Sequence, residues 1–244
     1  MPPANLPAFH LQWSDNPAHS LAVQAIMLDL DGTLVNTLDD FDAAVNAMLA
    51  ELHLPPVSRA FIARTVGKGS PYLIRQTLLH VGVEPAHAAA EAALFQRAHT
   101  LYLHHYGRMN AQASHLYPGV QQSLTHWHAV GLPLACITNK PTRHAIALLQ
   151  TLGVMQFFRC VHGGDYFERR KPDPLPLLET AKILGCAPNQ ALMVGDSAND
   201  AQAASAAGCP VLLVRYGYNH GEPIETVPAQ GYLNSLADLR MQAA

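Results

Sequence analysis

The chain has 244 residues, of which 49% are apolar and 14% are charged, and its formal net charge is −3. This composition can supply a hydrophobic core and excludes a chain that is disordered throughout, and the length suits one domain with a sizeable insertion. The 15 Lys and Arg residues form no basic run of the kind that binds nucleic acid, so no nucleic-acid partner is expected.

The first 21 residues lack the basic start and the apolar centre of a secretory signal. They contain several prolines and are predicted to form an irregular N-terminal extension. No stretch approaches the roughly 18 consecutive apolar residues that cross a bilayer, so no membrane partner is expected. The four cysteines lie more than twenty positions apart, without the close spacing of a zinc or redox site, which fits reduced thiols in a cytoplasmic enzyme.

From residue 22 onward, short apolar runs alternate with amphipathic segments. Strands are expected at 22–28, 132–138, 160–163, 191–195 and 210–214. Helices are expected at 119–130, 141–152 and 175–184, each closed by a glycine just after its last periodic residue. Strand–helix units of this length predict an α/β fold whose core is a doubly wound, Rossmann-like parallel sheet.

Residues 38–116 interrupt this alternation. Helical periodicity is present at 41–52, 70–80 and 85–106, and no convincing strand separates these segments. We therefore expect a helical cap domain over 38–116 and an α/β catalytic core over 22–37 and 117–244. Inserted after the first strand, the cap would stand over the carboxyl end of that strand, in a position to act as a lid.

The first polar loop is 29–34 (DLDGTL), directly after the first predicted strand. Asp29 and Asp31 are two positions apart, so at a strand end their carboxylates face the same side. Two close carboxylates repel each other unless a cation or a shared proton intervenes, and Mg²⁺ is the simplest remedy. A solvated turn also explains this motif on its own, so the prediction of a catalytic site depends on the groups at the other strand ends.

Two further loops carry groups that can bind an anion. After the second strand, the Thr138 hydroxyl and nearby backbone N–H groups can bind an anion, although ordinary helix capping also explains Thr138 and Asn139. The second of these loops, 169–174 (RRKPDP), contains Lys171, which can balance a phosphoryl group and clustered carboxylates. A solvated basic loop is the alternative.

The fourth loop, 195–200 (GDSAND), follows a predicted strand. Asp196 stands at the strand end, where its carboxylate can reach a metal ion. Asp200 lies four positions on and shares a helix face with Asp196 if the helix has begun. The alternative is a helix-capping aspartate among polar surface residues, which is more plausible for Asp200 than for Asp196.

The motifs DLDGTL, ITN, RKPDP and GDSAND, in this order, resemble those of the haloacid dehalogenase superfamily of phosphotransferases. Within it, the segments ITNKP (137–141), GGD (163–165), AAGCP (206–210) and YGYNHGEPI (216–224) are similar to those of bacterial phosphoglycolate phosphatases. Residues 38–116 resemble the superfamily's helical cap of the first type, and 66–69 resemble its glycine-bearing cap loop. Asn36 and Asp173 depart from the usual pattern, outside the core catalytic positions.

The resemblance implies a role for each motif residue. Asp29 is expected to be the nucleophile and Asp31 the general acid and base, with Thr138 and Lys171 completing the catalytic set. Mg²⁺ is expected on the Asp29 carboxylate, the Asp31 backbone carbonyl and Asp196. The remaining expected contacts are substrate binding by Asn139 and Lys68 and orientation of Asp196 or of a metal-bound water by Asp200.

The expected reaction is Mg²⁺-dependent hydrolysis of a small phosphorylated metabolite, 2-phosphoglycolate, through an aspartyl phosphate on Asp29. An acid at position 31 favours ester hydrolysis or phosphomutase chemistry. A sugar-phosphate phosphatase or phosphomutase of the same superfamily therefore stays open, as does an inactive domain that binds phosphate ligands. Nothing in the sequence predicts an oligomeric state.

Overall fold

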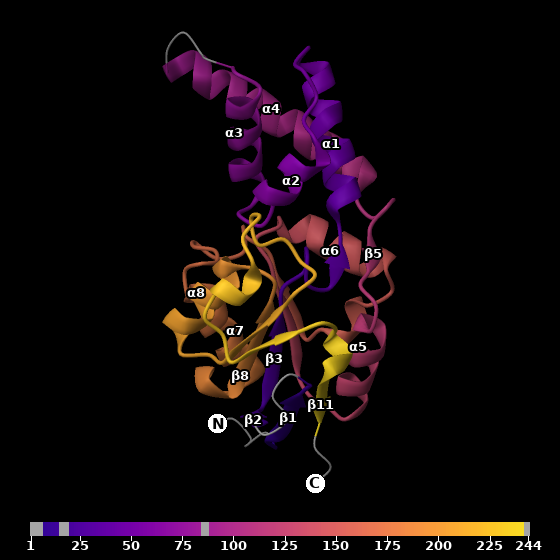
Figure 1. Ribbon diagram of the computed structural model, residues 1–244, viewed down its shortest axis with the longest axis vertical. Coiled ribbons are helices and arrows are strands. Elements are labelled where there is room, and N and C mark those ends of the chain that lie inside the picture. The colour runs from indigo at the N-terminus through magenta and orange to yellow at the C-terminus, as the bar shows by residue number, and fades with distance from the viewer. Residues whose placement is uncertain (1–6, 15–19, 84–87, 242–244) are drawn as a thin grey trace.

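A computed structural model of the chain describes residues 7–14, 20–83 and 88–241, and its centre is a parallel six-stranded sheet (Figure 1). Its strands are β3 (Ala25–Leu28), β6 (Leu134–Ile137), β7 (Cys160–His162), β8 (Ala191–Gly195), β9 (Val211–Val214) and β10 (Gly231–Leu233). Their spatial order is β10-β9-β8-β3-β6-β7. The predicted doubly wound α/β fold is confirmed, and β10 is a strand that the sequence analysis did not predict.

The strand order reverses at β3. From β3 the chain runs outward to β6 and β7, then crosses back to β8 and continues to β9 and β10. Ile26 of β3 is in register with Leu134 of β6 on one side and Leu192 of β8 on the other. In parallel sheets of this kind, ligands bind outside the carboxyl ends of the strands at such a reversal.

Helices cover both faces of the sheet because side chains along its buried strands point alternately to opposite sides. The helices are α5 (Val120–Ala129), α6 (Thr142–Thr151), α7 (Leu175–Leu184) and α8 (Ala198–Ala207). Ile26 and Leu28 pack in the hydrophobic core that includes α5 and α6, and Ala25 and Met27 pack in the core that includes α7 and α8. Short 3-10 turns occupy Met155–Phe157, Pro188–Gln190, Ile224–Thr226 and Leu236–Asp238.

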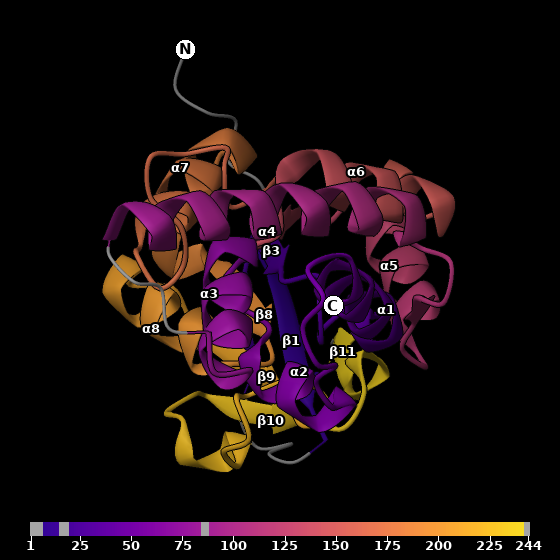
Figure 2. The ribbon, with the colours of Figure 1, turned by 90° about the horizontal axis from the view of Figure 1, so that it is seen from above.

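Four helices between β3 and β6 stand above the carboxyl edge of the sheet, with α4 lying across the top (Figures 1 and 2). They are α1 (Leu38–Glu51), α2 (Arg59–Thr65), α3 (Ser70–His80) and α4 (Ala88–Met109). Their apolar faces form a separate hydrophobic core. The short helix α2 was not predicted; the Ser58 hydroxyl accepts the N–H of Phe61 at its start. Residues 85–87 of the third predicted cap helix lie outside the described residues.

The two chain crossings between these helices and the sheet lie side by side. Strand β4 (Val35–Asn36) leads out and pairs antiparallel with β5 (His115–Leu116), which leads back. The buried Asp40 carboxylate accepts the N–H groups of Ala111 and Ala113, both at 2.8 Å. These contacts hold the return segment against the start of α1.

The prediction of an irregular segment over residues 1–21 is wrong where the structure describes it. Strand β1 (Phe9–Trp13) pairs antiparallel with β2 (Ser20–Val23) and with the last strand, β11 (Leu239–Met241), so both ends of the chain meet in one small sheet (Figure 1). Leu11 and Trp13 are buried in the core that also holds Ile26. The alternation of Phe9, Leu11 and Trp13 with polar residues is a period-two signal that the sequence analysis overlooked.

Candidate active site

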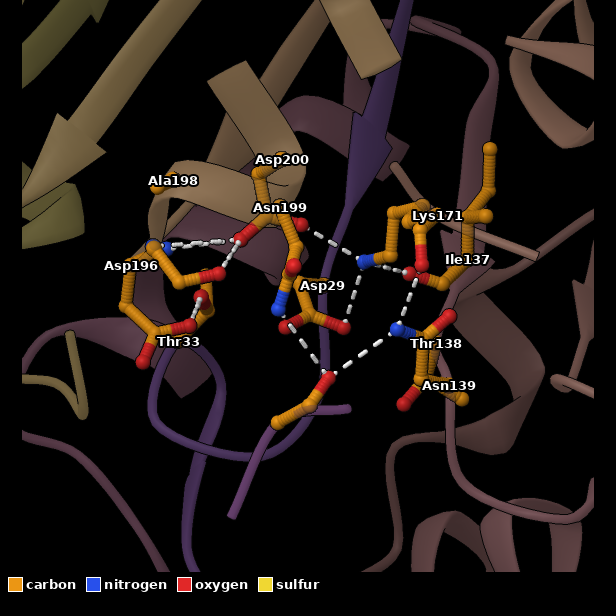
Figure 3. A network of polar contacts seen from close by, with 12 residues as sticks. Asp29, Thr33, Ile137, Thr138, Asn139, Lys171, Asp196, Ala198, Asn199 and Asp200 are labelled. Carbon is orange, nitrogen blue, oxygen red and sulfur yellow. Dashed lines mark hydrogen bonds and ion pairs between the residues drawn. The ribbon is translucent and has the colours of Figure 1, made fainter. Parts of the chain in front are cut away.

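Three strand ends bring the predicted acidic and hydroxyl groups together (Figure 3). Asp29 follows β3, Thr138 follows β6 and Asp196 follows β8, and all three are buried. The backbone N–H of Asp29 donates to Val194 at 2.9 Å and that of Thr138 to His162 at 3.0 Å. The sheet ladder therefore extends into the loops and fixes the directions of these side chains.

Lys171 joins two of the carboxylates. Its Nζ lies 2.8 Å from Oδ1 of Asp29 and 2.7 Å from Oδ1 of Asp200, and it donates to the Ile137 carbonyl at 2.6 Å (Figure 3). Burial alone favours a neutral lysine, but the charges of Asp200 and Asp29 outweigh it and raise the pKa of Lys171. The ammonium therefore stays charged beside Asp29, as the sequence analysis expected for the lysine of this loop.

Asp200 shapes the loop that carries Asp196. Its Oδ2 accepts the N–H of Ser197 at 3.1 Å, the Ser197 hydroxyl at 2.8 Å and the N–H of Asp196 at 3.3 Å. The carboxyl lies so close to Gly195 that a Cβ at that position would overlap it. Asp200 thus fixes the backbone on both sides of Asp196, and Gly195 is the residue that permits this approach.

The acidic cluster suits a hard divalent cation. Carboxylate oxygens of Asp29, Asp196 and Asp200 lie within 4.8 Å of one another. Burial raises the pKa of Asp29 to about 6, although Lys171 opposes the shift, and burial together with Asp29 and Asp200 raises that of Asp196. Mg²⁺ prefers oxygen ligands, and its charge would stabilise the ionised form of these buried carboxylates. These residues therefore fit a magnesium site.

Asp31 points to a different partner. Its Oδ1 lies 2.6 Å from Nζ of Lys140, a buried lysine that also lies 4.4 Å from the ring centre of Phe41 and 4.7 Å from that of Tyr106. The two carboxylates at the end of β3 are therefore separated, because each is held by its own buried ammonium. Sequence reasoning gave Lys140 no role, although it stands in the loop of Thr138, beside a proline.

The loop between α2 and α3 closes over this edge of the sheet. The carbonyl of Gly67 accepts Nδ2–H groups of Asn139, at 3.0 Å, and of Asn199, at 3.3 Å (Figure 3). Asn139, a predicted substrate contact, is thus placed beside the site. Lys68 instead lies over the Tyr72 ring, 5.1 Å from its centre. Asn199, a residue of the GDSAND motif, was not predicted to take part in the site.

Tyr218 connects the Asp196 loop to the start of the helical insertion. Its backbone N–H donates to Oδ2 of Asp196 at 2.6 Å, while its hydroxyl donates to Oδ1 of Asn36 at 2.7 Å and accepts the N–H of Thr37 at 3.1 Å. The Thr33 hydroxyl donates to the other oxygen of Asp196 at 3.0 Å. Tyr218 belongs to the YGYNHGEPI segment, for which the sequence alone supplied a resemblance but no role.

A small cavity lies between the helical insertion and the core loops. It offers about 30 Å³ to the centre of a water-sized sphere, room for roughly two water molecules. Its lining residues are Asp29, Asp31, Phe41, Val66, Gly67, Gly69, Ser70, Leu73, Tyr102, Leu103, Tyr106, Thr138, Asn139, Lys140, Pro141 and His144. The predicted nucleophile and the predicted general acid thus line the same cavity.

Known proteins share this sequence and this fold. The haloacid dehalogenase-like hydrolase family matches residues 26–214. Phosphoglycolate phosphatase of Thiobacillus denitrificans is 41% identical over 219 residues, which cover 89% of this chain and 94% of that protein. The crystal structure of a predicted phosphoglycolate phosphatase from Haemophilus somnus is 33% identical with a TM-score of 0.81, covering 88% of this chain and 96% of that one.

A more distant structure carries a ligand. CbbY from Rhodobacter sphaeroides, in complex with xylulose-(1,5)bisphosphate, is 25% identical with a TM-score of 0.72, over 88% of this chain and 95% of that one. None of the helices in the described parts of the chain is long and apolar enough to cross a membrane.

From the family match and the similarity to known proteins, the chain belongs to the haloacid dehalogenase-like hydrolases and is an enzyme similar to bacterial phosphoglycolate phosphatases.

Proposed function

We propose that the chain hydrolyses 2-phosphoglycolate to glycolate and phosphate through an aspartyl phosphate on Asp29, with Mg²⁺ as cofactor. The observation that carries the proposal is that two different lysines hold the two carboxylates at the end of β3 in different places. Lys171 holds Asp29 among the metal-binding carboxylates, and Lys140 holds Asp31 on the side of the cavity. One carboxylate is thus placed to attack phosphorus and the other to exchange a proton with the leaving oxygen.

In the first step, an Asp29 oxygen forms a bond to phosphorus while the bond to the ester oxygen breaks, and Asp31 gives that oxygen its proton. In the second step, Asp31 takes a proton from water as the water oxygen attacks phosphorus and releases Asp29. Lys171 and the Thr138 hydroxyl stabilise the phosphoryl oxygens. Mg²⁺, bound by Asp29, Asp196 and the backbone carbonyl of Asp31, would offset charge on the same oxygens.

The relatives named phosphoglycolate phosphatase support 2-phosphoglycolate as the substrate. A sugar-phosphate phosphatase is the second candidate, supported by the xylulose bisphosphate bound to CbbY. The charged and paired catalytic residues argue against an inactive binding domain.

The helical insertion is proposed to be the cap of this enzyme. Residues 38–116 would form the cap and residues 22–37 and 117–244 the catalytic core, with substrate entering when the Gly67 loop moves away from Asn139 and Asn199. Lys68, in the same loop, is proposed to contact the substrate. The four free cysteines fit the proposed cytoplasmic location.

The proposed substrate is tested by measuring phosphate release from a panel of phosphate esters, with Mg²⁺ and with a chelator. 2-Phosphoglycolate is expected to give the highest kcat/KM, and only with Mg²⁺. A higher kcat/KM for a sugar phosphate would establish the second candidate instead. No release from any ester would point to a phosphate-binding domain.

Addition of Mg²⁺ to the metal-free protein is expected to raise Tm, and to raise it more at about pH 7.5 than at about pH 5. The pKa of Asp29 is raised from 3.8 in the unfolded chain to about 6 in the folded protein. Protonated Asp29 therefore stabilises the folded metal-free protein fully below pH 3.8, and this stabilisation is lost as the pH rises through about 6. Above that pH the ionised cluster destabilises the metal-free protein and attracts Mg²⁺, whereas below it protons compete with the ion. Thermal melts over a pH series measure both effects.

The matched variants for this experiment are Asp196→Asn and Asp39→Asn. Asp196 belongs to the acidic cluster, and Asp39 is half exposed and pairs with Arg59 on the surface. Asp196→Asn is expected to lose most of the Mg²⁺-induced rise in Tm and Asp39→Asn to keep it. An equal rise in both variants would place the ion elsewhere.

A further inference from the structure

The described residues that line the cavity beside Asp31 include one lysine and no arginine. The lysine is Lys140, with its side chain 2% exposed. His144 also lines the cavity, but burial, helped by the charges of Arg143 and Lys140, lowers the pKa of His144 to about 4, so its ring is neutral at physiological pH. Any anionic group that enters this space beyond the phosphate therefore meets Lys140.

The ammonium of Lys140 has hydrogen-bonding capacity left over. Among the described residues Asp31 is its hydrogen-bond acceptor, at 2.6 Å, and the ammonium also lies over the faces of the Phe41 and Tyr106 rings. A lysine ammonium carries three N–H donors. A second oxygen acceptor can thus bind the same ammonium without displacing Asp31.

The Tyr106 ring, which lies beside Lys140, carries a buried hydroxyl without a partner. The Tyr106 side chain, on α4, is 1% exposed and lines the cavity, and among the described residues no group hydrogen-bonds to its hydroxyl. A buried donor left unpaired costs free energy, which an acceptor on a bound ligand would recover. The tyrosine belongs to the helical insertion and the lysine to a loop of the core.

We propose that Lys140 and Tyr106 together bind the carboxylate of the substrate and so select carboxylate-bearing phosphate esters. The inference rests on the proposed function, since Asp31 must contact the ester oxygen to protonate it. In 2-phosphoglycolate a single methylene carbon separates that oxygen from the carboxylate. An ammonium already bonded to Asp31 is therefore within reach of the carboxylate whenever Asp31 contacts the ester oxygen.

The test compares two substrates that differ only in this group. Ethyl phosphate has a methyl group where 2-phosphoglycolate has its carboxylate. In Tyr106→Phe, KM for 2-phosphoglycolate is expected to rise about tenfold, the size of a lost hydrogen bond to a charged group, with kcat and the ethyl phosphate constants within about twofold of the parent values. Tyr166→Phe, which removes the hydroxyl of an exposed tyrosine outside the cavity, is the matched control and should change nothing.

Lys140→Met separates binding of a carboxylate from positioning of Asp31. If Lys140 served Asp31 alone, both substrates would lose kcat/KM by the same factor. We expect kcat/KM to fall by a factor about a hundredfold larger for 2-phosphoglycolate than for ethyl phosphate. Burying the substrate carboxylate without a cation costs more free energy than losing one hydrogen bond. Equal losses for the two substrates in both Lys140→Met and Tyr106→Phe would overturn the proposal.

The proposed substrate and the proposed carboxylate site are excluded by different results. If the parent enzyme prefers a sugar phosphate to 2-phosphoglycolate, the proposed substrate is wrong whatever the variants do. The ratio of kcat/KM for 2-phosphoglycolate to that for ethyl phosphate still tests the carboxylate site in that case. A ratio that falls in Tyr106→Phe and in Lys140→Met supports the site, and a constant ratio excludes it.

Discussion

Asp29→Asn is expected to lower Mg²⁺-dependent phosphate release by about 10⁴-fold or more, the scale seen when a covalent nucleophile is removed. The amide has nearly the shape of the carboxylate, and its oxygen can still accept a hydrogen bond from Lys171, which lies 2.8 Å from Asp29 in the parent. It cannot form an acyl phosphate with the reactivity of a carboxylate. The loss should therefore appear in kcat, with KM little changed, in a continuous assay of released phosphate.

Asp39→Asn is the matched control for this loss. It makes the same chemical change at a half-exposed aspartate of α1 whose partner is Arg59, and its kcat should equal that of the parent. Thermal melts of both variants establish that the fold is intact. Mg²⁺-dependent release that survives in Asp29→Asn would show that another group attacks phosphorus.

Lys171→Met is expected to destabilise the metal-free protein by about 3–5 kcal/mol, the usual consequence of removing one partner from a buried ion pair. Lys171 neutralises the carboxylates of Asp29 and Asp200, and both would be left buried without their cation. Urea unfolding at neutral pH measures the difference. Without Lys171, which lowers the pKa of Asp29 in the parent, Asp29 keeps its proton to a higher pH, so the deficit should shrink as the pH is lowered toward about 6, where Asp29 titrates in the parent.

Lys182→Met gives the comparison for that experiment. Lys182 pairs with Glu179 on the surface of α7, where its side chain is 71% exposed. Surface pairs of this kind contribute about 1 kcal/mol at most, so the urea midpoint should hardly move. A Lys171→Met protein as stable as Lys182→Met would mean that the acidic cluster does not depend on its lysine.

The parts of the site that could be predicted from the sequence are those whose geometry follows from parallel strands. Asp29, Thr138 and Asp196 each follow an apolar run, and parallel strands must end at one edge, so their meeting required no knowledge of packing. The helical insertion was visible because three of its segments keep helical periodicity. Both are local sequence patterns, and the structure contains the strands and helices that they predict.

What could not be predicted depends on contacts between distant segments. Lys140 stands beside a proline in a loop, as Lys171 does, but only the folded chain shows that Lys140 contacts Asp31. Asn199 meets Gly67 across 132 positions. No spacing in the sequence records such pairs, because they are set by how loops distant in the chain meet above the sheet.

The pairing of β1 with β11 gives the chain an order of assembly. Leu11 lies opposite Met241, 230 positions further along, so this edge of β1 has no partner until β11 has been synthesised. Until then the apolar residues of β1 have an unpaired strand edge, which invites association with other chains. Trp13 packs against Gly231 in the folded protein, so the environment of this indole reports closure of the small sheet.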